Sequence, residues 1–417
     1  MNKGKTMVVK EKLKKLINYT VTIDGKEERP IVIMAPDGSD ENSLRIYAFG
    51  GNIGRIPLTE EGKYQLADKG YSKYITYPKY PIINKNTSHI YEFPNWLGQF
   101  KQEDKCKEEL EEYLRKEKGE LREYFDVDSL YLPLILAASR NRFTCKNKDN
   151  YGTKMERWKQ QEIAKYFMEH SSEKGSIITD LEFDIPISDE RKKVKAVRAD
   201  TEDMQKMKGA SKPDFVIFDG QRFGIVEFKY LGQSMKTHSS NSLDWHLLDF
   251  YDAFENDAHD RIELYNKCLD RLKCLLDYGV IFPDDSDKRK EFETKMNSCR
   301  RAANSGKEKE LKDLFWFGFL FVGGKKSTIK NNIRNQLIEP VLPKKCEGEK
   351  SQVEKNAAKT VKDLIENEGI ELYGRYCDDS DNISDFSIDL KEKTIKELYK
   401  ELYKELESKI LEEKKKH

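Results

Sequence analysis

The sequence predicts an α/β fold in which helices flank a mixed central sheet, with an N-terminal α+β module before it and a C-terminal helix after it. Between residues 153 and 322, apolar stretches follow the order helix, strand, strand, strand, helix, strand, the pattern of a sheet covered by helices. Two of these strands are joined by Asp219-Gly220, a strong hairpin signal. Charged residues make up 36% of the chain and aromatic residues 11%, which indicates solvated helix faces over a core of large side chains.

Residues 1–127 are interpreted as a separate α+β module whose role the sequence does not indicate. Its first strands are expected at residues 19–23, 31–35 and 44–49, divided by the turn signals Asp24-Gly25 and Asp37-Gly38. No group of residues in this module points to a particular chemistry.

Residues 128–390 form the second predicted domain, and its elements follow from hydrophobic periodicity. Ser242 is placed to cap the N-terminus of a long helix that reaches about residue 278. The other expected elements are helices at residues 130–142 and 153–170 and strands at residues 176–187, 215–218, 223–228 and 315–322.

Residues 391–417 are predicted to form an amphipathic, highly charged C-terminal helix. Its apolar stripe consists of Leu398, Leu402, Leu406 and Ile410. Such a stripe either docks on its own domain or pairs with a partner helix, so a homodimer or a partner protein is one possible use of it.

Composition excludes several classes of protein. The 75 basic and 75 acidic side chains give a formal net charge of zero, which argues against a polycationic nucleic-acid binder and requires any polyanion site to be a local patch. The longest apolar runs are too short to cross a bilayer, and the N-terminal residues lack the apolar segment of a signal peptide. The seven cysteines contain no Cys-x-x-Cys pair, which is typical of reduced thiols. We therefore expect a cytoplasmic protein without a membrane partner.

The chemistry of the chain is concentrated in residues 211–230, SKPDFVIFDGQRFGIVEFKY. Residues two apart in a strand share a face, so Glu227 and Lys229 point the same way, and Asp214 begins the neighbouring strand. Carboxylates suit Mg²⁺, which also accepts carbonyl ligands such as that of Phe228 and keeps waters for a phosphate. Lys229 could hold or deprotonate the attacking water, or stabilise charge on the phosphate. With no His or Cys expected in this cluster, zinc is disfavoured.

This segment resembles the PD-(D/E)XK nuclease superfamily, the restriction-endonuclease-like fold. Pro213-Asp214 corresponds to the first half of the motif and Glu227-Phe228-Lys229 to the second. The resemblance covers residues 150–325 and implies an αβββαβ core. It also implies a Mg²⁺-dependent nuclease, with Mn²⁺ as a substitute, that leaves 5′-phosphate and 3′-hydroxyl ends, whether it acts as an endonuclease or as an exonuclease.

The resemblance also implies an acidic residue on the first core helix. Glu156 is our choice as a fourth catalytic and metal-binding residue, with Glu162 as the fallback and Gln160 one turn later as a nucleic-acid contact. His246 and Asp249 lie on one face of the next helix, where they could approach the scissile phosphate or have a structural or capping role.

Context separates this motif from two other copies. Pro36-Asp37 is followed by Glu61-Gly62-Lys63, and Pro283-Asp284 by Glu293-Thr294-Lys295. The first spacing crosses a long polar turn, and the second lies in a charged helix. Only the copy at residues 213–229 has two apolar strands and a tight turn.

Basic residues suggest where a nucleic acid, DNA in preference to RNA, would bind. Residues 323–335 and 191–198 are basic and contain no acid, so they are either backbone-phosphate contacts or ordinary solvated loops. The contacts expected in the first segment are Lys325, Lys326, Lys330 and Arg334. The function predicted from all these features is phosphodiester hydrolysis in bacterial restriction, defence or repair. The alternatives are a catalytically silent module that binds nucleic acid or protein, and an assembly protein that uses the C-terminal helix.

Overall fold

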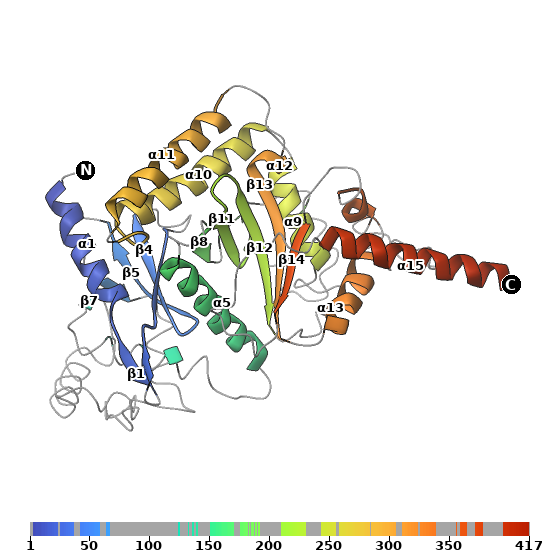
Figure 1. Cartoon of the computed structure of the whole chain (residues 1–417), viewed down its shortest axis with the longest axis horizontal. Coiled ribbons are helices and arrows are strands. Elements are labelled where there is room, and N and C mark those ends of the chain that lie inside the picture. Colours follow the sequence, from blue (N-terminus) through green and yellow to red (C-terminus); the bar gives the residue numbers. More distant parts are fainter. Residues whose placement is uncertain are drawn as a thin grey trace. The chain divides into compact units, whose positions relative to one another are not determined.

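The computed structural model shows a mixed α/β protein in which two compact units are distinguished (Figure 1). The first unit comprises Met1–Ser172 and Arg271–Lys290, and the second comprises Glu173–Asp270 and Glu291–His417. The predicted α/β class is confirmed. The structure describes residues 3–23, 26–36, 42–58, 64–66, 124–125, 132, 136, 139–140, 151–170, 176–181, 183, 185–186, 188–189, 191, 210–230, 243–255, 258–283, 285–305, 311–323, 326–338, 356, 359–364, 372–377 and 395–416.

The first unit contains an antiparallel five-stranded sheet in the order β3-β4-β5-β6-β7. Three of the strands expected near the N-terminus are present, as β1, β3 and β4. Gln161 on α5 is buried, accepts a hydrogen bond from Gly50 N and donates one to Pro30 O at 2.8 Å, which anchors this helix within its unit. The elements are α1 (Lys3–Ile17), β1 (Val21–Ile23), β2 (Lys26–Glu28), β3 (Ile31–Met34), β4 (Ser43–Ala48), β5 (Gly51–Pro57), β6 (Tyr64–Leu66), β7 (Tyr124–Phe125) and α5 (Tyr151–Glu169).

The second unit is built on a mixed five-stranded sheet in the order β14-β13-β12-β11-β8. Strands β8, β11 and β12 are antiparallel neighbours, whereas β13 runs parallel to β12 and β14 runs parallel to β13. A parallel pair requires a crossover connection, and helices occupy the chain between β12 and β13. The strands are β8 (Ile177–Leu181), β11 (Phe215–Phe218), β12 (Phe223–Tyr230), β13 (Phe315–Val322) and β14 (Leu372–Cys377), and a separate short pair is formed by β9 (Ile185–Pro186) and β10 (Ala210–Ser211).

The crossover from β12 to β13 contains α9 (Leu243–Glu255), α10 (Ala258–Asp277), α11 (Ser286–Ala303) and α12 (Leu311–Leu314). The prediction of one long helix up to residue 278 is therefore wrong, since α9 and α10 are separate. The sequence between them is Asn256-Asp257, and both residue types favour helix ends over helix interiors because their side chains compete for backbone hydrogen bonds. The two residues themselves lie outside the described part of the chain.

The two faces of β12 have different roles. Phe223, Ile225, Glu227 and Lys229 share one face, and the partner of Glu227 on β13 is Phe319. Helix α9 covers this face, because Phe250 stacks on Phe317 with ring centroids 6.2 Å apart and an interplanar angle of 4°. On the opposite face, the Trp316 ring lies over Gly224, where a Cβ atom would be only 2.0 Å from Trp316 Cζ2. The Trp316 ring thus occupies the space on this face that a side chain at position 224 would need.

After β13, the described part of the chain adds strand β14 and several helical segments to the second unit, including a short helical stretch at residues 359–364. Strand β14 has no counterpart among the predicted elements. Residues 326–333 form a helix; they belong to the basic segment that was interpreted as either phosphate contacts or an ordinary solvated loop. The other helical segments are α13 (Lys326–Ile333), the π-helical η2 (Arg334–Ile338) and α15 (Ile395–Lys416).

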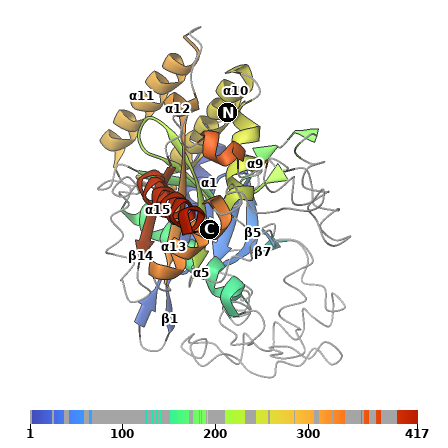
Figure 2. The same cartoon turned by 90° about the vertical axis from the view of Figure 1, so that its right-hand side faces the viewer.

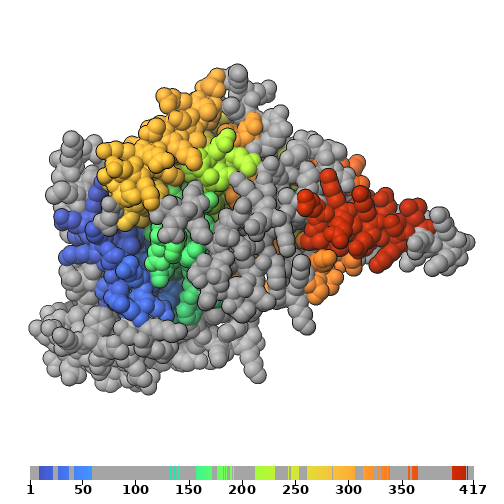
Figure 3. Space-filling model, in the orientation of Figure 1, coloured from blue at the N-terminus to red at the C-terminus, as the bar shows by residue number. Residues whose placement is uncertain are grey.

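Helix α15 lies beside β14 and α13 in the views of Figures 1 and 2. Tyr399 and Leu402 are buried, so the N-terminal half of the helix docks on its own unit. Its outer surface is visible in red in Figure 3, and Leu411 near the C-terminus is 54% exposed. Among the described residues, no helix is long and apolar enough to cross a membrane.

Candidate functional site

Asp214 lies immediately before β11, beside the strand that carries Glu227. The β11–β12 register pairs Phe215 with Val226, so Asp214 stands at the position that faces Glu227. Asp214 Oδ2 accepts a hydrogen bond from Phe228 N at 2.8 Å. The hairpin therefore brings the first carboxylate of the motif to the strand that holds the second carboxylate and the lysine.

Glu227 and Lys229 lie on the α9-facing side of β12 and contact each other. Lys229 Nζ donates a hydrogen bond to Glu227 Oε1. The carboxylate is only 3% exposed, whereas the lysine side chain is 15% exposed. A buried carboxylate is costly unless it is paired, so Lys229 compensates a charge that the surrounding aromatic side chains would not tolerate alone.

The Phe228 backbone is placed to contribute an oxygen. The N–H and C=O groups of one strand residue point to the same neighbouring strand, and Phe228 N points to Asp214. The pairing of β11 with β12 ends at Val226. The Phe228 carbonyl thus faces Asp214 beyond the last residue pair of the hairpin.

His246, which was expected on a helix face that could approach the scissile phosphate, contacts this cluster. Its Nε2 atom is 3.1 Å from Glu227 Oε1, its side chain is 14% exposed, and both ring nitrogens are buried. The argument that no histidine belongs to the cluster is therefore wrong. The sequence placed His246 on the same helix face as Asp249, but it could not place this helix against β12, because twelve residues separate the end of β12 from the start of α9.

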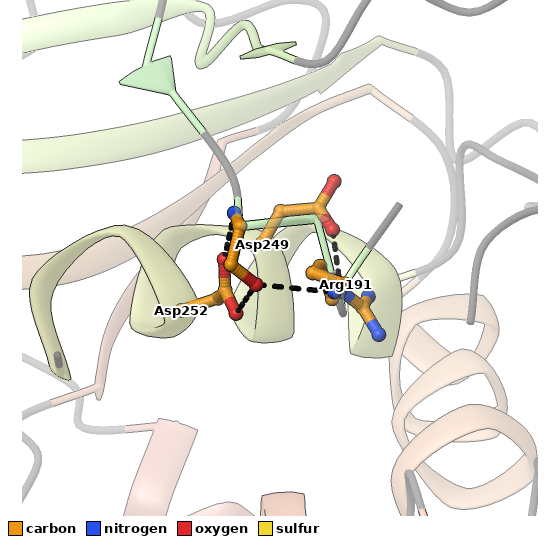
Figure 4. A network of polar contacts seen from close by, with 4 residues as sticks. Arg191, Asp249 and Asp252 are labelled. Atoms are coloured by element: carbon orange, nitrogen blue, oxygen red, sulfur yellow. Dashed lines mark hydrogen bonds and ion pairs between the residues drawn. The ribbon is translucent and has the colours of Figure 1, made fainter. Parts of the chain in front are cut away.

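A network of buried and part-buried polar contacts fixes α9 at Asp249 and Asp252, which follow His246 in the sequence (Figure 4). Arg191 Nε donates to Asp249 Oδ1 at 2.7 Å, and the two side chains are only 8% and 4% exposed. One turn on, Asp252 accepts hydrogen bonds from Ser188 N and Ser188 Oγ, both at 2.7 Å. Arg191 was proposed as part of a basic run that contacts phosphates, whereas the structure buries it in an ion pair.

The remaining predicted residues are distributed over both units. Glu156 and Gln160 lie on α5 in the first unit, where Gln160 is buried. The fallback residue Glu162 forms an ion pair with Lys159 at 3.0 Å. The structure brings Asp214, Glu227, Phe228 and Lys229 together within the second unit and leaves the role of Glu156 a prediction.

The predicted phosphate contacts near residue 330 are only partly described. Lys330 lies on α13 and is half-buried. Arg334 belongs to η2 and forms an ion pair with Glu405 on α15 at 3.5 Å. Lys325 and the side chain of Lys326 lie outside the described residues.

The donor set of the cluster fits a divalent cation in part. Asp214 and Glu227 offer carboxylate oxygens, Phe228 a carbonyl and His246 an imidazole nitrogen, all of which are common ligands of divalent metals. Within the described residues, no three His, Cys, Asp or Glu side chains converge closely enough to form a complete metal-binding cluster. The backbone carbonyl and waters would have to complete the coordination.

A separate cavity of about 480 Å³ lies at the turn between β11 and β12, lined by Gly220, Gln221, Tyr265, Cys299 and Asp313 among others. Tyr265 donates a hydrogen bond to Gln221 O, and burial raises the pKa of its phenol. Because strands rise about 3.3 Å per residue, the six positions from Gln221 to Glu227 place this cavity roughly 20 Å from the carboxylate. The cavity and the Asp214–Glu227–Lys229 cluster are therefore at opposite ends of β12.

No protein-family model matches the chain, and neither a curated protein nor a solved structure shows significant similarity to it.

Proposed function

We propose that the protein is a metal-dependent nuclease of the PD-(D/E)XK type, which hydrolyses phosphodiester bonds, with DNA as the favoured substrate. The observation that carries the proposal is the hydrogen bond from Phe228 N to Asp214 Oδ2, because it holds the Asp of one strand against the Glu-Phe-Lys segment of the next. The two strands, their hairpin and the two charged side chains on one face support this proposal, because the motif needs its carboxylates and its lysine close together.

The topology of the second unit supports the same proposal. Three antiparallel strands, β8, β11 and β12, are followed by helices and by β13, which is parallel to β12. Preceded along the chain by α5, these elements follow the order αβββαβ. The C-terminal end of β12 is therefore the expected place of a phosphoryl-transfer site, because ligands of open α/β sheets commonly bind at the carboxyl ends of their strands.

The residues of the cluster have separate roles in this proposal. Asp214, Glu227 and the Phe228 carbonyl would hold Mg²⁺ or Mn²⁺, and a bound ion would supply Lewis acidity and an activated water. Lys229 is less buried than Glu227 and would orient the attacking water or stabilise the negative charge that develops on the phosphate. Glu156 remains the residue that we propose as a fourth contributor, on the resemblance alone.

The experiment compares cleavage of supercoiled plasmid by the wild-type chain and by Asp214→Ala, Glu227→Ala and Lys229→Ala proteins, with Mg²⁺ or Mn²⁺ and with chelator. We expect nicking or linearisation that needs the metal and falls at least about 100-fold in each variant. The matched controls are Glu293→Ala and Lys295→Ala, which alter another Glu-x-Lys sequence of the chain, on helix α11. Circular dichroism of each protein checks that it is folded. Full activity in any of the three variants would show that its residue is wrongly assigned.

A second candidate is a nuclease-like module that binds nucleic acid or a partner protein without cutting. It is favoured by the lack, among the described residues, of three metal-ligating side chains in one cluster. If plasmid, single-stranded DNA and RNA all stay intact while the chain binds one of them equally with and without metal, the binding module replaces the nuclease.

A further inference from the structure

His246 lies directly against the most buried carboxylate of the candidate site. The separation of its Nε2 atom from Glu227 Oε1 is 3.1 Å, and both belong to the second unit. The imidazole ring packs on Phe250, one turn along the helix, with ring centroids 6.1 Å apart. Phe250 in turn stacks on Phe317 of β13. The histidine is therefore part of the packed interface between α9 and the sheet.

Helix α9 is also fixed at its polar positions. The ion pair between Asp249 and Arg191 lies three residues after His246, and the hydrogen bonds of Asp252 to Ser188 lie one turn further. The Arg191 and Asp249 side chains are buried, and the contacts of Asp252 with Ser188 are half-buried. Two independent sets of contacts, aromatic and ionic, thus determine how far His246 stands from Glu227.

The measured separation matches that of two ligands on one cation. Two atoms that each lie about 2.1 Å from an octahedral ion, at a right angle to each other, are about 3.0 Å apart. A carboxylate oxygen and an imidazole nitrogen at this spacing make a mixed donor pair. Carboxylate and carbonyl oxygens suit Mg²⁺ and Mn²⁺ alike, whereas an imidazole nitrogen favours a first-row transition metal over Mg²⁺, whose protein ligands are oxygens.

We propose that His246 Nε2 is a direct ligand, together with Glu227, of the divalent cation of this site, and that the site therefore prefers Mn²⁺ to Mg²⁺. The inference deepens the proposed function by naming the metal, and it rests on that function only in using the same carboxylate. Asp214 and the Phe228 carbonyl lie next to Glu227 and offer further oxygens, but the Asp214, Glu227 and His246 side chains do not converge on one point in this structure, so the carbonyl and waters would complete the coordination of an ion held by Glu227 and His246. The alternative is a purely structural contact in which His246 hydrogen-bonds Glu227 and binds no ion.

The test measures the metal rather than the reaction. Mn²⁺ is added to the tag-free full-length chain, and pulsed electron paramagnetic resonance records whether a ¹⁴N nucleus is coordinated to the ion. We expect the ¹⁴N modulation of a bound imidazole in the wild-type protein. We also expect it to change to a ¹⁵N pattern when the chain is grown with ¹⁵N-labelled histidine, which needs no substitution and so does not depend on a variant that folds.

Two variants assign the signal. His246→Gln should remove the modulation and narrow the ratio of Mn²⁺ to Mg²⁺ affinity by about 10- to 100-fold, the usual effect of losing one metal-site partner. His170→Gln is the matched control, because His170 lies on α5 in the first unit and bonds to Tyr166 O at 2.9 Å.

The inference is overturned if the wild-type chain binds no Mn²⁺, if bound Mn²⁺ shows no nitrogen modulation, or if the modulation survives in His246→Gln. Its failure is distinct from that of the proposed nuclease. Metal-dependent plasmid cleavage without a nitrogen ligand would leave the nuclease standing and remove His246 from the metal. A nitrogen ligand without cleavage would support His246 as a metal ligand and contradict the proposed nuclease.

Discussion

Replacing Asp249 by alanine should loosen helix α9, because it leaves a buried guanidinium without its carboxylate. The Arg191 and Asp249 side chains are 8% and 4% exposed, and their Nε and Oδ1 atoms are 2.7 Å apart. Removal of one partner from so buried a pair typically costs about 3–5 kcal/mol. The exposed pair Arg300–Asp270, with nearly the same separation of 2.6 Å but exposures of 32% and 65%, should contribute less than about 1 kcal/mol.

Hydrogen exchange followed by mass spectrometry measures this difference locally, which suits a chain of two units whose global unfolding need not be two-state. A loss of 3 kcal/mol or more should speed exchange of the amides in residues 243–255 at least about 100-fold in the Asp249→Ala protein. Exchange in residues 151–169 of the first unit provides an internal reference. Asp270→Ala is the control variant with the same chemical change at an exposed pair.

The double variant Arg191→Met/Asp249→Leu separates the ion pair from simple packing. Replacing both partners by apolar side chains of similar size is often neutral or stabilising, so protection of α9 should return to within about tenfold of the wild type. The reasoning is refuted if Asp249→Ala exchanges like Asp270→Ala, or if the double variant is no better protected than Asp249→Ala.

Two further predictions concern the core of the second unit. Gly224→Ala should destabilise the protein by about 1–3 kcal/mol, because its Cβ would meet the Trp316 ring at 2.0 Å. Urea unfolding followed by circular dichroism tests this. Recovery of stability in Gly224→Ala/Trp316→Leu relative to Trp316→Leu would confirm the clash, whereas unchanged stability of Gly224→Ala would contradict it. Stability should also fall at alkaline pH, because burial raises the pKa of the Cys268 thiol from 9.0 to about 12. The stabilisation from the protonated thiol is full below pH 9 and is lost as pH rises towards 12. Urea midpoints between pH 8 and 11 should therefore decline less steeply in Cys268→Ala, and an equal slope in both proteins would argue against this origin.

Hydrophobic periodicity predicted the central strands because their local signals agree with their final environment. Residues 223–228 and 315–322 are apolar on both faces, and both faces are buried in β12 and β13. The Asp219-Gly220 turn fixed the β11–β12 register, and through it the position of Asp214 opposite Glu227. Because the hairpin is short, the relative position of Asp214 and Glu227 could be predicted from the sequence alone.

The other parts of the site depend on contacts between elements that are distant in the sequence. His246 reaches Glu227 only because α9 folds back over the sheet, and Arg191 reaches Asp249 across 58 positions of the chain. Basic residues near 191 and 330 have the same local appearance whether they face solvent or pair with a carboxylate. Strand β14 was missed for a related reason, since its six-residue sequence LYGRYC is interrupted by Gly374 and Arg375 and its position in the sheet comes from pairing with β13.

The cluster lies at the point where the apolar face of β12 becomes polar, and this position follows from the energetics of the sheet. Phe223 and Ile225 of β12 face Phe315 and Phe317 of β13, and helices cover them. Glu227 and Lys229 continue the same face beyond them, beside Phe319 and Phe321. Aromatic neighbours lower the local dielectric and strengthen every charge interaction there. A carboxylate in such an environment is stable only when a cation lies close to it. Lys229 supplies that positive charge in this structure, and a divalent ion would supply it in the proposed function.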